Sequence, residues 1–74
     1  MKIVFTRHAW EKLTQRNITS DMVRAVVDSP TKLTTDSEKF YAFRKFGGKY
    51  LKVVFVRQGD VVVIITQYFV TSLL

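Results

Sequence analysis

The chain has 74 residues, 47% of them hydrophobic and 14% aromatic, which is enough apolar material for one small domain with its own core. Twelve lysines and arginines against six aspartates and glutamates give a net charge of +6, a balance that attracts polyanions. The absence of cysteine excludes a disulfide framework and a thiolate metal site, and no apolar stretch approaches the ~20 residues that span a bilayer. We therefore expect a single domain over residues 1–74, located in the cytoplasm.

The first residues predict an edge strand followed by a capped helix. Lys2 to Phe5 is a short apolar run. Thr6 is a suitable N-cap, and Phe5 and Trp10 stand at the spacing of a hydrophobic staple around it. A helix over about Arg7 to Arg16 follows. Its predicted buried stripe consists of Ala9, Trp10 and Leu13.

A second helix is expected over about Ser20 to Asp28. Thr19 is its predicted N-cap, and Ile18 and Val23 form a second staple pair around it. Pro30 predicts that this helix ends near Asp28, because the residue before a proline is driven out of the helical conformation. The apolar positions at helical spacing are Met22, Val23, Val26 and Val27.

The Gly47-Gly48 pair predicts a tight hairpin, since glycine tolerates the positive φ of primed two-residue turns. The expected pairs are Phe46 with Lys49, Arg44 with Leu51, Ala42 with Val53, Phe40 with Phe55, and Glu38 with Arg57 as a charge pair. One face is then a core face, composed of Phe40, Ala42, Leu51, Val53 and Phe55. The other face alternates cations and rings, namely Lys39, Tyr41, Phe43, Lys45, Tyr50 and Lys52.

Strong strands are expected over about Lys39 to Phe46, Lys49 to Arg57 and Val61 to Val70, with a weaker one at Lys32 to Asp36 before a turn at Asp36-Ser37. A two-residue loop before the last strand would send Val62, Ile64, Thr66 and Tyr68 to the core face, whereas a three-residue loop would reverse this. The predicted fold class is α+β. Two short N-terminal helices, about residues 7–28, pack on a twisted antiparallel sheet of three to four strands, a meander over about residues 31–70.

The face that alternates cations and rings is the predicted contact surface for a polyanion. Aromatic rings beside cations suit single-stranded RNA, whose bases stack on the rings. The predicted nucleic-acid-binding residues are Lys39, Tyr41, Arg44, Lys45, Tyr50, Lys52 and Arg57. Two short helices cover only one face of a sheet, so a partner protein or a second copy of the chain is an alternative occupant of this face. A basic surface that serves solubility alone is a further interpretation.

Candidate catalytic residues are few. No glycine-rich phosphate loop, paired-histidine metal site or nucleophile elbow occurs, and no cofactor or metal is expected. Metal-independent RNA cleavage needs a base, a proton donor and cations for the phosphate. His8 is the candidate base, because the macrodipole at the helix start favours the neutral imidazole. Tyr41, Tyr50 or Tyr68 could donate the proton, and Arg16, Arg44, Lys52 or Arg57 could hold the phosphate. The predicted catalytic set is His8, Arg16 and Tyr68. The alternative is that His8 only packs near the helix start.

These residues resemble a known family. The opening Phe5-Thr6-Arg7-His8-Ala9, followed by Glu11, Leu13, Arg16, Ile18-Thr19 and Val23, is similar to the helix motif of the prokaryotic domain-of-unknown-function family 4258. The Asp28-Ser29-Pro30 stop, the Gly47-Gly48 turn and the strands at Leu51-Lys52-Val53-Val54 and Val63-Ile64-Ile65-Thr66 match the rest of its layout. The resemblance covers almost the whole chain, but the motifs of this family do not indicate which reaction, if any, its members catalyse.

The order of elements also resembles the BrnT-type toxins, which belong with the RelE-like ribonucleases. Their last strand is Ile-Ile-Ser-Ala-Arg-like, and Ile64-Ile65-Thr66-Gln67-Tyr68 keeps the small hydroxyl residue but lacks the arginine. This resemblance implies a RelE-like fold and a toxin-type protein that binds RNA or the ribosome, cleaves RNA without a metal and pairs with an antitoxin-like protein. The alternative is a non-enzymatic basic module that binds nucleic acid or protein and forms homodimers.

Overall fold

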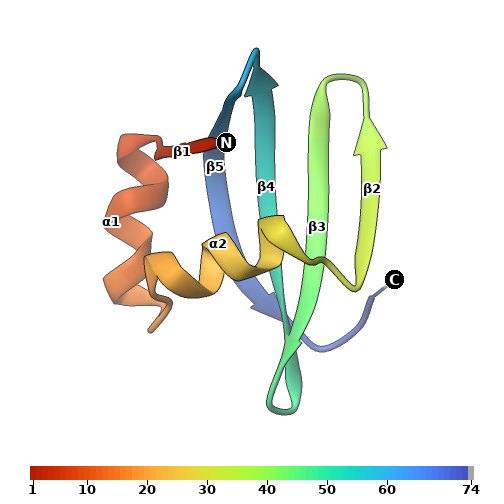
Figure 1. Ribbon diagram of the computed structural model, residues 1–74. Helices are drawn as coiled ribbons and strands as arrows, with labels where there is room; N and C mark the ends of the chain where they lie inside the picture. Colours follow the sequence, from red (N-terminus) through yellow and green to blue (C-terminus); the bar gives the residue numbers. More distant parts are fainter. Residues whose placement is uncertain (74) are drawn as a thin grey trace.

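The computed structural model describes residues 1–73 and shows two helices on one side of a five-stranded sheet (Figure 1). The elements are β1 (Lys2–Phe5), α1 (Arg7–Gln15), α2 (Ser20–Asp28), β2 (Lys32–Asp36), β3 (Lys39–Phe46), β4 (Lys49–Gln58) and β5 (Val61–Val70). The strand order is β1-β5-β4-β3-β2. The predicted α+β class is therefore confirmed. Within residues 1–73, neither helix has the length and apolar character that a membrane crossing requires.

The sheet is larger than predicted and is mixed rather than wholly antiparallel. Strands β2 to β5 form the expected antiparallel meander, but β1 joins the edge of β5 in parallel, with Lys2 opposite Val61 and Phe5 opposite Ile64. The Thr6 amide continues this pairing by donating to the Ile64 carbonyl at 3.0 Å. The pairing escaped prediction because a parallel neighbour is joined through a long crossover, which leaves no turn motif between the two strands.

Local capping fixes both helices where the sequence predicts them. The hydroxyl oxygens of Thr6 and Thr19 accept hydrogen bonds from the backbone at the start of α1 and α2, each at 3.1 Å. At the end of α1, Asn17 adopts a left-handed conformation with φ 55°, and the Ile18 amide donates back to the Leu13 carbonyl at 2.9 Å. This pattern is a Schellman motif, which turns the chain sharply so that α2 begins within a few residues.

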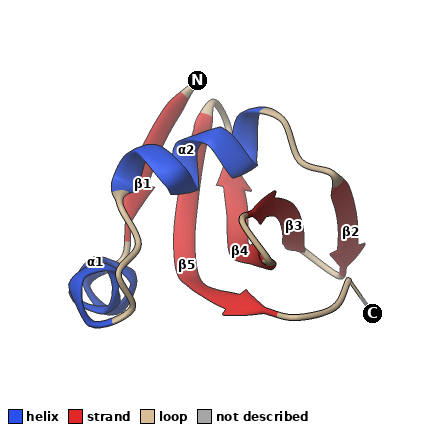
Figure 2. Cartoon of the chain, turned by 90° about the horizontal axis from the view of Figure 1, so that it is seen from below, coloured by secondary structure: helices blue, strands red, loops and turns tan. Residues whose placement is uncertain are grey.

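Valine and alanine side chains of the helices pack on the core face of the sheet. Figure 2 shows α2 lying across that face, with α1 beside β5. Val23 and Val26 of α2 are fully buried, as predicted, whereas Met22 and Val27 are half-buried at the margin of the core. The sheet contributes Ala42, Leu51, Val53, Phe55, Val62 and Ile64 to the core.

The prediction that Trp10 is buried is wrong. Its side chain is 61% exposed, while Ala9 and Leu13 of the same helix are buried. The Trp10 ring meets Phe5 edge-on, with centroids 5.7 Å apart and an interplanar angle of 70°, so the predicted staple is present on the outside of the domain. Helix α1 has only β5 and β1 beneath it, and its buried stripe is correspondingly narrow.

The Gly47-Gly48 hairpin has the predicted register from Phe46–Lys49 to Phe40–Phe55. The expected pair of Glu38 and Arg57 does not form, because the ladder ends at Lys39 opposite Val56. The Arg57 guanidinium instead lies 5.6 Å from the centroid of the Phe40 ring, which is stacked on Phe55. The alternation of core and outer positions along β3 and β4 is thus the predicted one.

A bulge in β5 gives this strand two registers in succession. Phe55 pairs with Ile64 and Val54 pairs with Thr66, so Ile65 is the extra residue. Before the bulge, Ile64 faces the core; beyond it, Thr66 and Tyr68 lie on the opposite face. Neither predicted register therefore holds over the whole strand. In Figure 2 the second half of β5 bends away from the first and runs toward β2.

Two alanine substitutions in α1 test this packing. Leu13→Ala removes a buried side chain and should lower the free energy of unfolding by about 2–4 kcal/mol. Trp10→Ala removes an exposed ring and its edge contact, so its cost should be about 1 kcal/mol or less. Urea unfolding followed by circular dichroism measures both. A larger loss for Trp10→Ala than for Leu13→Ala would contradict the observed placement of α1.

Candidate functional site

The sheet face opposite the helices, here called the outer face, carries cations and aromatic rings in one line. Lys32 of β2 stands opposite Phe43 of β3, Phe43 opposite Lys52 of β4, and Lys52 opposite Tyr68 of β5. Beyond Tyr68, the Arg16 guanidinium at the end of α1 lies 5.8 Å from the Tyr68 ring centroid. These five residues, the cation–aromatic row, cross four strands and alternate strictly between positive charge and ring.

Lys52 is the centre of the row. Its ammonium lies 5.2 Å from the ring centroid of Tyr41, 5.6 Å from that of Phe43 and 5.5 Å from that of Tyr68. Each distance is within the range of a cation–π contact, in which the negative face of the ring attracts the charge. Three such contacts restrict a side chain that is otherwise flexible. The charge is therefore held at a defined place on the outer face.

Arg16 is fixed by hydrogen bonds to β5. Its Nη1 donates to the Thr66 hydroxyl at 3.2 Å and to the Gln67 carbonyl at 2.9 Å. The Gln67 side chain points to the other side of the strand, where it is fully buried and donates from Nε2 to the Ala9 carbonyl at 2.8 Å. Its Oε1 has no protein partner among residues 1–73. Residues 66 and 67 thus attach both ends of α1 to the bent part of β5.

A hollow of about 260 Å³ lies beside Lys52, and its lining residues are Lys32, Thr34, Tyr41, Phe43, Lys52 and Leu73. The Lys32 ammonium donates to the Leu73 carbonyl at 3.0 Å, which joins residue 73 to β2. In Figures 1 and 2 the chain after β5 runs toward β2, in agreement with this contact. Among residues 1–73, the lining of the hollow includes two lysines and no carboxylate side chain.

The structure divides the seven predicted nucleic-acid-binding residues between the two faces. Lys39, Tyr41, Lys45, Tyr50 and Lys52 lie on the outer face. Arg44 lies on the core face and donates from Nη1 to the Ala25 carbonyl of α2 at 3.2 Å. Arg57 also has core-face parity and lies over Phe40. Both arginines follow the period-two alternation of a strand, in which they share parity with Leu51 and Phe55.

The three predicted catalytic residues do not all come together. Arg16 and Tyr68 are in contact. His8 is exposed in the first turn of α1 and makes no side-chain hydrogen bond within residues 1–73. It lies about 12 Å from Arg16 along the helix axis, at a rise of about 1.5 Å per residue.

Sequence reasoning missed Lys32, which begins the row. Its strand is short and its exposed side chains give only a weak pattern. The signal was the turn that follows: a two-residue loop at Ser37-Glu38 places Asp36 opposite Lys39, and the same register then places Lys32 opposite Phe43.

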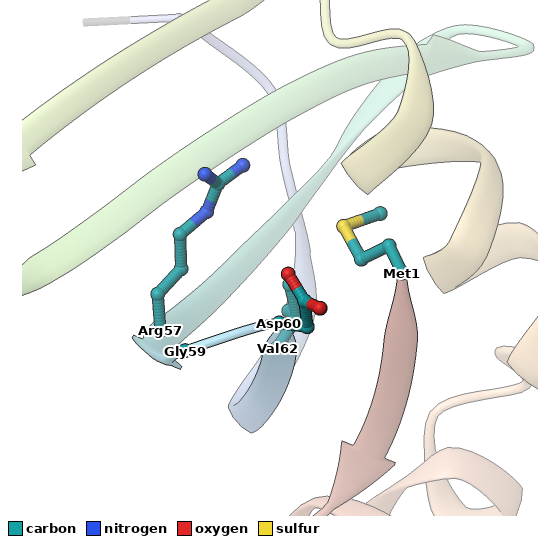
Figure 3. A pocket seen from close by; sticks show the side chains of 5 residues that line it. All are labelled: Met1, Arg57, Gly59, Asp60 and Val62. Carbon is teal, nitrogen blue, oxygen red and sulfur yellow. The ribbon is translucent and has the colours of Figure 1, made fainter.

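A second hollow, of about 270 Å³, lies at the β4–β5 turn and is lined by Met1, Arg57, Gly59, Asp60 and Val62 (Figure 3). In the view of Figure 3 the Asp60 carboxylate stands between Arg57 and Met1. The side chains of the lining therefore carry one charge of each sign. Among residues 1–73 no group of three potential metal-ligating side chains is present.

Comparison with known proteins gives one match. Residues 5–69 match a family described as a domain of unknown function (DUF4258). The matched range contains both helices, strands β2 to β4 and the whole cation–aromatic row. No curated protein and no solved structure matches the chain.

Substitution of neighbouring cations on β3 tests the division between the faces. Arg44→Met removes a charged donor from the C-terminal end of α2 and should lower the free energy of unfolding by about 1–2 kcal/mol. Lys45→Met makes the same charge change at an exposed position and should alter it by less than about 0.5 kcal/mol. Chemical denaturation measures both. Equal losses from the two variants would show that Arg44 does not stabilise α2.

Proposed function

The chain belongs to the family described as a domain of unknown function (DUF4258), and we propose that it binds single-stranded RNA on its outer face. The single observation that carries this proposal is the cation–aromatic row. Rings and fixed positive charges alternate along it, as the bases and phosphates of a nucleic-acid strand do.

The dimensions of the row suit an extended strand. Neighbouring strands of a sheet are about 4.8 Å apart, so Lys32 and Lys52, two strands apart, are separated by roughly 10 Å with a ring between them. Tyr41, Tyr50 and Tyr68 are half-buried, so each of these residues keeps part of its surface accessible. Phe43 is only 6% exposed and forms the floor of the row. We therefore expect the tyrosines to stack on the bases, and the lysines and Arg16 to contact the phosphates.

In the part of the chain that the structure describes, no carboxylate side chain pairs with a cation of the row. Within residues 1–73 the ion pair present is Arg7–Glu11 on α1, at 3.8 Å, away from the outer face. Lys32, Lys52 and Arg16 interact instead with rings, a hydroxyl and backbone carbonyls. These contacts hold the cations in place and leave their charge available to a polyanion.

RNA cleavage of the RelE-like kind would require a base beside the phosphate. Arg16 and Tyr68 are positioned together, but His8 lies about 12 Å away along α1. We therefore propose binding without cleavage. An RNA substrate that is cut by the purified protein, with the cutting lost in His8→Ala, would replace this proposal with a ribonuclease.

Salt dependence tests the role of the charges. The affinity for a fluorescent single-stranded oligouridylate should fall about tenfold or more between about 50 and 200 mM salt, because binding releases counterions from the phosphates. Lys52→Gln should lower both the affinity and the slope of log affinity against log salt, the slope by about 0.7. Arg24→Gln makes the same charge change at an exposed position of α2 and is the matched control. Equal effects of the two variants, or an affinity independent of salt, would contradict the proposal.

Stacking is tested at Tyr68. Tyr68→Ala should weaken RNA binding by about 1–3 kcal/mol, whereas Tyr68→Phe, which keeps the ring, should bind within about threefold of the unsubstituted protein. Fluorescence anisotropy with the same oligouridylate measures both. If the phenylalanine variant loses as much affinity as the alanine variant, the hydroxyl and not the ring makes the contact, and base stacking is excluded at this position. Binding of an acidic peptide in place of RNA would identify a protein partner for the outer face.

A further inference from the structure

The hollow at the β2 end of the row has the chemistry of an anion site. Lys32 and Lys52 stand on either side of Phe43 in the register of the sheet, and both line the same space of about 260 Å³. Thr34 and Tyr41 add hydroxyl groups to the lining, and none of the lining residues within 1–73 carries a carboxylate side chain. Two positive charges that share a small space favour a ligand that carries more than one negative charge.

An oxygen already occupies part of this site. The Lys32 ammonium donates to the Leu73 carbonyl at 3.0 Å, which is a distance that a phosphate oxygen would also adopt. A carbonyl leaves the ammonium charge uncompensated, so exchange of this neutral acceptor for a charged one strengthens the hydrogen bond. The contact with residue 73 thus marks where a phosphate oxygen fits.

We propose that this hollow binds the terminal phosphate of an RNA strand whose following nucleotides lie along the cation–aromatic row; the inference rests on the function proposed above. A terminal phosphate monoester carries about −1.5 to −2 charges at pH 7, which matches two lysines, whereas an internal diester carries only one. The hollow has a volume of about 260 Å³, less than the ~300 Å³ at which small-molecule sites begin, and this size suits a single phosphate group. Leu73 closes it on one side.

Three oligouridylates of one length test the inference, with a 5′-phosphate, with a 3′-phosphate or with hydroxyl groups at both ends. One phosphorylated form should bind about tenfold or more tightly than the hydroxyl form, as an added charge-assisted hydrogen bond predicts. Lys32→Gln should abolish this preference. Because Lys32 also belongs to the row, the variant should weaken the hydroxyl form as well, but by less than it weakens the phosphorylated form. Lys32→Arg should restore the preference. Lys45→Gln changes a lysine on the outer face that does not line the hollow, and it should leave the preference unchanged.

The outcomes separate this inference from the proposed function. Equal affinity for all three oligonucleotides, with salt dependence and the Tyr68 effect intact, overturns the terminal-phosphate site and leaves RNA binding in place. A phosphate preference that survives in Lys32→Gln also overturns it. If uridine monophosphate competes with a phosphorylated oligonucleotide while the hydroxyl oligonucleotide does not bind, the result supports the phosphate site and contradicts binding of an RNA strand along the row. Circular dichroism of each variant shows that it remains folded.

Discussion

The structure depends on the constraint that two short helices can cover only one face of this sheet. The core face is satisfied by α2 and by the inner stripe of α1, both rich in small and branched side chains. The opposite face must remain stable in contact with water while it carries several large rings. It does so by placing ammonium and guanidinium groups over those rings, so that part of the aromatic surface is covered by side chains that stay charged. The chemistry of the outer face is thus a consequence of the layer arrangement.

The bulge at Ile65 connects this arrangement to the candidate site. Without the extra residue, the parity that places Ile64 in the core would place Tyr68 there as well. The bulge reverses the parity, so that Gln67 enters the interior and Tyr68 joins the row. Gln67 then holds α1 through the Ala9 carbonyl, and its own carbonyl holds Arg16. One irregular residue therefore positions two of the five members of the row.

Local signals in the sequence predict most of the elements, and long-range pairing accounts for what they miss. The caps at Thr6 and Thr19, the stop before Pro30 and the Gly47-Gly48 turn act over a few residues, and both helices and the central hairpin follow from them. The parallel strand β1 and the bulge depend on partners far along the chain, which no local motif specifies. Trp10 is exposed because α1 lies at the sheet margin, a fact of tertiary placement.

The same distinction applies to the site. Alternation along β3 and β4 predicts Tyr41 and Lys52 on one face and Arg44 on the opposite face, although residue type alone places all three among the predicted nucleic-acid-binding residues. Arg16 was singled out as a catalytic residue, whereas its contact with Tyr68 requires the bend of β5. Composition identifies the types of residue in a site, and strand register decides which of them meet.

The parallel pairing of β1 with β5 has a consequence for synthesis of the chain. Strand β1 is synthesised before the other strands of this sheet, and it finds its hydrogen-bonding neighbour only when β5 has emerged from the ribosome. Until then Ile3, Val4 and Phe5 have no sheet to join, and α1 has no β5 against which to bury Leu13. Contacts between distant parts of a chain slow folding, because the entropy cost of closing the loop comes before the stabilisation that strand pairing provides. Completion of the sheet of this domain therefore depends on β5, the strand that follows all the others along the chain.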